Sequence, residues 1–111
     1  MKKYCVSLEL AKEMKKLGFE QVSEFYWFYS EQEEKYKLVK KGYICDWKES
    51  YSAYTVGELG DMLPKWAYSY KKNKRWICEE SDCQQLELTL SNTEADARAK
   101  MLIYLKKEGI I

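Results

Sequence analysis

The sequence contains no histidine, and this absence restricts the chemistry that the protein can perform. Histidine is the commonest general base in enzymes and the commonest protein ligand of metal ions. Catalytic pairs and triads of serine or cysteine with histidine are therefore excluded. Glycine is scarce as well, and Gly57 and Gly60 match neither a GxGxxG fingerprint nor a P-loop. We therefore expect no catalytic activity; a carboxylate enzyme is the third alternative, with the candidates Asp46, Glu49, Glu58 and Asp61.

Long apolar segments are missing too. No stretch approaches the roughly 18 apolar residues that a membrane-spanning helix requires. The charged residues Glu9, Lys12 and Glu13 appear before any apolar segment builds up at the start, which is not the pattern of a secretory signal. We therefore expect a cytoplasmic protein whose four cysteines are reduced thiols.

The cysteines give little support for a metal site. Cys78 and Cys83 have four residues between them, which is the limit of the usual spacing of zinc ligands. Cys5 and Cys45 would have to complete such a site from distant parts of the chain, and we interpret both as small apolar residues. The sequence therefore predicts no metal and no cofactor.

Net charge is nearly absent, with 19 basic against 18 acidic residues. The overall field of the protein therefore favours no class of partner, and any electrostatic argument must come from a local cluster. Aromatic residues, in contrast, are abundant at 15% of the 111 residues, and they include ten tyrosines and four tryptophans. This composition and length indicate one folded domain over residues 1–111 and not a disordered chain.

Three segments are expected to be helices, because apolar residues recur in them at helical spacing. Gly18 and Gly109 follow two of them, at the position where a left-handed residue closes a helix. Thr55 and Glu58 have the spacing of a capping box, and Pro64 ends the helix that they begin. The predicted helices span residues 8–17, with Ser7 as the N-cap, 55–63 and 94–108.

The remaining ordered segments are expected to be strands, because they are rich in aromatic residues or alternate between apolar and polar residues. A polar loop at 30–34 and a turn at 71–74 would join neighbouring strands into antiparallel hairpins. We therefore predict an α+β fold, in which an antiparallel sheet of about four to five strands packs against two longer helices and one short helix. The expected strands span residues 25–29, 36–39, 43–45, 66–70, 75–79 and 85–90.

Five consecutive residues of the first expected strand are aromatic, so rings point to both faces of the sheet. A central strand covered on both faces would explain this run. The alternative is an exposed aromatic face that binds a protein partner or a second copy of the chain. Our first hypothesis is therefore a non-enzymatic interaction module, with the partner-binding candidates Phe25, Tyr26, Trp27, Phe28 and Tyr29.

The segment 65–76 carries five basic residues, no acidic residue and several interleaved rings. Such a hairpin could neutralise phosphates and stack bases, or it could be an ordinary lysine-rich turn whose rings lie in the core. Our second hypothesis is a nucleic-acid-binding accessory protein. Its candidate residues are Lys65, Trp66, Tyr70, Lys71, Lys72, Lys74, Arg75 and Trp76.

Four blocks of the sequence also carry a resemblance. They are the Cys-x-Ser-Leu-Glu-Leu-Ala-Lys block at 5–12, the Phe-Tyr-Trp block at 25–27, and the segments 51–64 and 93–105. Together they resemble a family of small uncharacterised proteins from bacterial prophages and mobile elements. The resemblance implies a phage-derived intracellular protein and supplies neither an activity nor a site.

Overall fold

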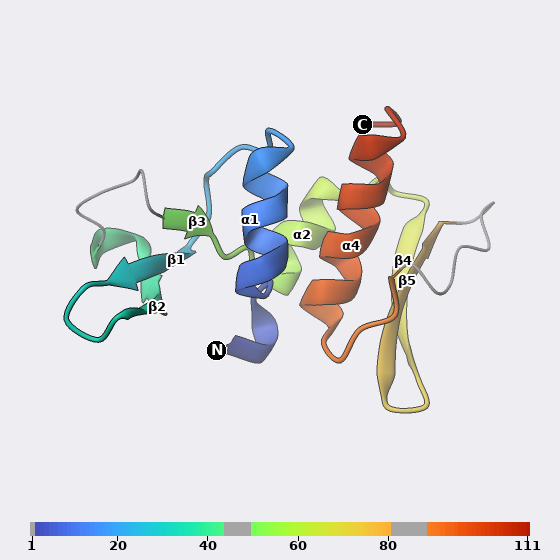
Figure 1. Cartoon of the computed structure of the whole chain (residues 1–111). Helices are drawn as coiled ribbons and strands as arrows, with labels where there is room; N and C mark the ends of the chain where they lie inside the picture. Colours follow the sequence, from blue (N-terminus) through green and yellow to red (C-terminus); the bar gives the residue numbers. More distant parts are fainter. Residues whose placement is uncertain (1, 44–49, 81–88) are drawn as a thin grey trace.

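The structure is a computed structural model that describes residues 2–43, 50–80 and 89–111 (Figure 1). Helices α1 and α4 lie side by side in the middle of the molecule, and a small antiparallel sheet lies on each side of them. The described helices are α1 (Leu8–Lys16), α2 (Val56–Met62) and α4 (Glu94–Lys107), with the 3-10 turns η1 (Lys2–Tyr4) and η2 (Lys41–Tyr43). The described strands are β1 (Phe25–Ser30), β2 (Lys35–Lys40), β3 (Ser50–Ser52), β4 (Ala67–Lys72) and β5 (Arg75–Glu80).

The α+β class is confirmed, but the prediction of a single sheet is wrong. One sheet has the strand order β2-β1-β3, and the β4–β5 hairpin forms a second, separate sheet. Helix α4 explains the separation, because it is apolar on two sides. Ala95, Ala99 and Leu102 pack into a core shared with α1 and β1, whereas Ala97 and Met101 pack against β5. Because both of these sides are apolar, each must pack against another element of the fold.

The larger core forms around β1. Trp27 lies within it, and its indole N–H donates a hydrogen bond to the carbonyl of Val6 at 2.9 Å. Tyr26 is buried on the opposite face of the strand, where its hydroxyl donates to the carbonyl of Gln21 at 3.1 Å. The polar groups of Trp27 and Tyr26 thus both have partners, as buried tryptophan and tyrosine side chains require.

The predicted helix ends are confirmed. Gly18 and Gly109 both have positive φ angles, of 90° and 72°, and the residue after each donates its N–H back into the last turn of the helix. Thr55 and Glu58 form the expected capping box. Ser7 is the N-cap of α1, but its N–H donates to the Asp96 carboxylate at 2.7 Å, which joins the beginnings of α1 and α4.

One strand prediction differs from the structure, and another lies mostly outside the described residues. The third strand of the first sheet is Ser50–Ser52, which pairs with β1 and places its two small serines opposite the rings of Tyr26 and Phe28. In the predicted strand 43–45, Tyr43 ends η2 and residues 44–45 lie outside the described residues. Most of the predicted strand 85–90 also lies outside them, and Thr89 at its described end binds the backbone of Cys78 through its hydroxyl.

Cys5, Cys78 and Tyr54 are ionisable residues that lie buried in these cores. Burial raises the pKa of the Cys5 and Cys78 thiols to about 11, because an ionised thiolate would lose its hydration. Burial likewise raises the pKa of the Tyr54 hydroxyl to about 12. The folded state therefore holds these protons more tightly than the unfolded state does.

We expect the free energy of unfolding to be independent of these groups at neutral pH and to fall as the pH rises from about 9 towards 11. In that window the unfolded chain releases protons that the folded chain retains, so alkaline conditions favour unfolding. Urea unfolding at pH 7.5, 9 and 10.5 measures how the free energy of unfolding depends on pH. The Cys5→Ala variant should lose less of this free energy between pH 9 and 10.5. An equal or greater stability at pH 10.5 than at pH 9 would contradict the prediction.

Candidate nucleic-acid interface

The aromatic strand β1 offers less surface than its composition suggests. Phe25, Tyr26 and Trp27 are buried, and only Phe28 and Tyr29 are partly exposed. The rings next to them in the sheet are also covered, because lysines of α1 lie within 4.8 to 5.1 Å of the ring centres of Tyr36 and Tyr51. The structure thus places most of the candidate protein-binding strand in the core.

The β4–β5 hairpin is the second candidate surface, and its turn is shorter than the sequence suggested. Asn73 and Lys74 alone form the turn, with φ angles of 51° and 68°. Two consecutive positive φ angles are the mark of a type I′ turn, whose twist matches that of the flanking strands. Strand β4 consequently extends to Lys72, which pairs directly with Arg75. The cations Lys72, Lys74 and Arg75 therefore lie at the tip of the hairpin. The tip extends beyond the helices (Figure 1).

The outer face of this hairpin carries a pair of stacked rings. Tyr68 and Tyr70 have ring centres 6.1 Å apart and planes inclined by 24°. Both hydroxyls donate to the carboxylate of Glu79 at 2.9 Å, and these hydrogen bonds raise the pKa of both tyrosines. Tyr68 is 50% exposed. Strand alternation and pairing place Lys72 and Arg75 on this same face, beside the rings.

The inner face of the hairpin points towards α4. Ser69, Lys71, Trp76 and Cys78 alternate onto it, and Cys78 is completely buried. The ammonium group of Lys71 lies 6.0 Å from the ring centre of Trp76. The eight residues predicted for nucleic-acid binding thus do not form one surface. The outer face of the hairpin carries Tyr70, Lys72 and Arg75, and the inner face carries Lys71 and Trp76. Lys74 lies in the turn, and the exposed residues Lys65 and Trp66 precede β4.

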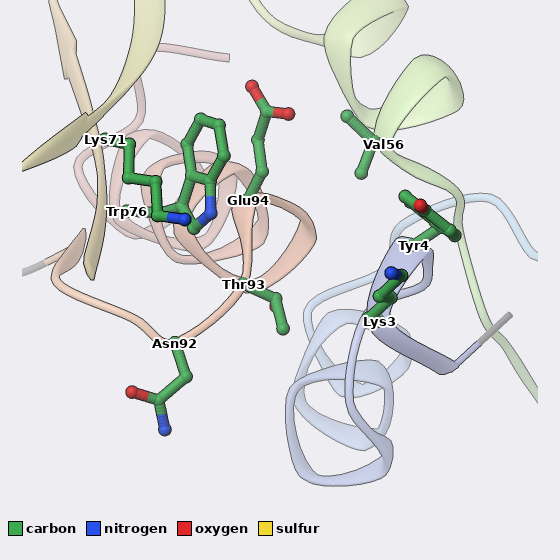
Figure 2. A pocket seen from close by; sticks show the side chains of 8 residues that line it. All are labelled: Lys3, Tyr4, Val56, Lys71, Trp76, Asn92, Thr93 and Glu94. Carbon is green, nitrogen blue, oxygen red and sulfur yellow. The ribbon is translucent and has the colours of Figure 1, made fainter. Parts of the chain in front are cut away.

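A pocket of about 300 Å³ lies between the inner face of the hairpin and η1 (Figure 2). Figure 2 shows Lys71 and Trp76 on one side and Lys3 and Tyr4 on the other, with the beginning of α4 between them. Sequence reasoning missed Lys3 and Tyr4, because only long-range pairing brings them here. The backbone bridge from Cys5 to Thr55 fixes this arrangement. The lining residues are Lys3, Tyr4, Val56, Lys71, Trp76, Asn92, Thr93 and Glu94.

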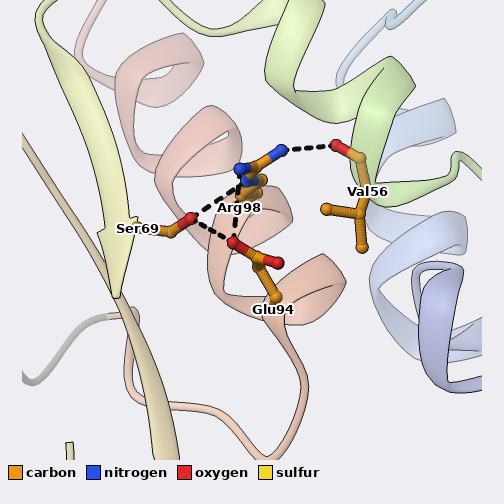
Figure 3. Close-up of polar contacts among 4 residues, drawn as sticks. All are labelled: Val56, Ser69, Glu94 and Arg98. Carbon is orange, nitrogen blue, oxygen red and sulfur yellow. Dashed lines mark hydrogen bonds and ion pairs between the residues drawn. The ribbon is translucent and has the colours of Figure 1, made fainter. Parts of the chain in front are cut away.

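A half-buried cation, Arg98, anchors the hairpin beside this pocket (Figure 3). The guanidinium of Arg98 donates to Ser69 on β4 at 3.1 Å, to the carbonyl of Val56 on α2 at 2.7 Å, and to Glu94 at 3.2 Å. Ser69 in turn donates to Glu94 at 2.6 Å. The network joins α2, α4 and β4. Its guanidinium group also compensates the negative charge of the Glu94 carboxylate at the edge of the pocket.

The described part of the chain contains no group of three or more cysteine or carboxylate side chains that could hold a metal ion. Within residues 2–43, 50–80 and 89–111, no helix combines the length and apolar character that crossing a membrane requires. Cys5 and Cys78 are free thiols in the core.

We expect the two glycines of α2 to respond oppositely to alanine. At Gly60 a methyl group would lie 2.6 Å from the guanidinium of Arg98, whereas at Gly57 its nearest neighbour is 4.0 Å away. Gly57→Ala should raise the free energy of unfolding by up to about 1 kcal/mol through helix propensity. Gly60→Ala should lower it, because Arg98 must release a charge-assisted hydrogen bond worth about 1.5–3 kcal/mol.

Urea unfolding of the two alanine variants and of Arg98→Met measures this difference. In the Arg98→Met background, Gly60→Ala should become stabilising, because the group that it displaces has been removed. Equal stabilisation by both alanines in the otherwise unchanged protein would show that Arg98 moves freely and does not anchor the hairpin.

No family model matches the chain, and no curated protein or solved structure matches it either. Nothing about activity or partners is transferred to the chain from a relative. The charges and rings of the β4–β5 hairpin are the features from which a function can be inferred.

Proposed function

We propose that the protein binds nucleic acid through the outer face and tip of the β4–β5 hairpin. The observation that carries this proposal is the stacked pair of the exposed Tyr68 and the half-buried Tyr70, which lies beside the paired cations Lys72 and Arg75. Aromatic rings on a strand offer bases a surface for stacking, and adjacent cations neutralise the phosphates between them. The protein acts by binding and performs no catalysis.

The near-zero net charge does not oppose this proposal, because electrostatic attraction at physiological ionic strength is local. The Debye length in such solutions is about 8 Å, so distant acidic residues have little effect on a ligand at the hairpin. No acidic residue occurs from Lys65 to Cys78, and this stretch contains five cations. Glu79, the nearest acid on the outer face, is hydrogen-bonded by both tyrosines.

The β1 surface supports the protein-partner hypothesis less well. Three of its five candidate rings are buried, so a partner would contact mainly Phe28 and Tyr29. Stable protein interfaces bury about 800 Å² on each partner, which far exceeds what two half-buried rings supply. We therefore favour a nucleic-acid-binding accessory protein, and the four resembling sequence blocks add to this only the expectation of a phage or mobile-element origin.

Reversing the charge of the hairpin tip should abolish most of the binding. We expect the triple variant Lys72→Glu, Lys74→Glu and Arg75→Glu to bind fluorescein-labelled oligonucleotides at least ten-fold more weakly at 50 mM salt. The slope of log K against log salt should fall by about two, because roughly 0.7 counterions are released for each phosphate contact with a single strand. Fluorescence polarisation against single- and double-stranded DNA and RNA measures both quantities.

The matched control reverses three exposed cations at the other end of the molecule, Lys35, Lys40 and Lys41. It changes the net charge by the same amount and should retain most of the binding. Equal losses in the two triple variants would show a nonspecific charge effect. If the unchanged protein does not bind at low salt, the proposed function is rejected. The candidate surface would then be the protein-binding one around Phe28 and Tyr29.

The tyrosine pair should act through its rings and not through its hydroxyl groups. We expect Tyr68→Ala with Tyr70→Ala to weaken binding by about ten-fold or more, since stacking contributes about 1–3 kcal/mol for each base. The matched variant Tyr68→Phe with Tyr70→Phe keeps both rings and loses only the hydrogen bonds to Glu79, so it should bind nearly as well as the original protein. If the phenylalanine variant were as weak as the alanine variant, stacking would not be the mode of contact.

A further inference from the structure

The pocket between η1 and the inner face of the hairpin combines features that the outer face does not have. Trp76 forms one of its walls, and this residue is held in place by two backbone hydrogen bonds to Ser91, of 2.7 and 2.9 Å. One side of the Trp76 ring packs against the small core of α4 and β5. Tyr4, which is 50% exposed, stands on the opposite wall (Figure 2). Two rings, one of them rigidly held, thus face a common space.

Each of these rings has a cation beside it. The ammonium group of Lys3 lies 5.0 Å from the ring centre of Tyr4, and that of Lys71 lies 6.0 Å from the ring centre of Trp76. Among the described residues that line the pocket, Glu94 is the single acidic one, and Arg98 and Ser69 bind its carboxylate. The pocket therefore presents two lysines without an equal opposing charge, and these favour an anion.

We propose that this pocket holds one unpaired nucleotide, with its base between Trp76 and Tyr4 and its phosphate near Lys3 and Lys71. The inference rests on the proposed function, because the nucleotide belongs to the strand that the hairpin binds. A pocket of about 300 Å³ is at the lower end of the range for ligand sites, so it accommodates a single nucleotide and no duplex. A paired base is stacked inside its helix and must leave the stack before it can enter such a pocket. The protein therefore prefers single strands to duplexes.

A charge variant with a close control tests this preference. Lys3→Glu should weaken binding to a single-stranded oligonucleotide by about five- to ten-fold and leave binding to a blunt duplex of the same length nearly unchanged. Lys2→Glu is the control, because Lys2 is an equally exposed neighbour on η1 that does not line the pocket. The control should bind both nucleic acids as the original protein does.

A spectroscopic titration locates the ligand directly. In ¹H–¹⁵N NMR spectra, adenosine monophosphate should shift the indole N–H signal of Trp76, which the Trp76→Phe variant identifies by its loss. Ribose 5-phosphate at the same concentration should leave that signal in place, because it lacks a base. A shift caused equally by both compounds would show an anion site and overturn the nucleotide pocket.

The result separates this inference from the function on which it depends. If oligonucleotides bind, but Lys3→Glu behaves like Lys2→Glu and the Trp76 signal does not move, the pocket proposal fails while the hairpin interface stands. If the unchanged protein binds no oligonucleotide and no mononucleotide, both proposals fail together. A shifted Trp76 signal with selective loss of single-strand binding in Lys3→Glu would establish the pocket.

Discussion

The fold depends on one constraint, which is that helix α4 is apolar on two sides along most of its length. Seven of its 14 residues are buried, and they divide into two sets that face different cores. Covering the first set requires α1, α2 and the sheet around β1, and covering the second requires the β4–β5 hairpin. The separation of the two sheets and the place of the hairpin at one side of the molecule both follow from this requirement.

The hairpin is consequently different on its two faces. Cys78 and Trp76 attach the inner face to α4, and Arg98 adds a hydrogen-bonded connection to β4 and α2. The outer face and the tip lie beyond this attachment, where the paired strands hold Lys72 and Arg75 in fixed register. A rigid base and an exposed, charged end are the properties expected of a recognition element that is presented on a scaffold.

Local features of the fold could be read from the sequence, and long-range features could not. Gly18, Gly109 and the Thr55–Glu58 capping box were predicted correctly, because each depends on interactions within a few residues. The β3 strand and the second apolar face of α4 were missed, because neighbours distant in the sequence determine them. The candidate site divides in the same way: the basic hairpin was visible as a run of residues, but Lys3 and Tyr4 join it only through long-range contacts, which include the bridge from Cys5 to Thr55 and the hydrogen bond from Ser7 to Asp96.

The turn of the β4–β5 hairpin shows that its sequence is not optimised for folding alone. Lys74 has a φ angle of 68°, in a region where a side chain is strained and where glycine is the residue that hairpins of this type prefer. Glycine there would relieve the backbone and remove a positive charge from the tip. The chain therefore retains a conformational penalty at a position where an exposed cation lies in the turn, which is a compromise between thermodynamic stability and surface chemistry. Compromises of this kind are concentrated where a protein meets its ligands.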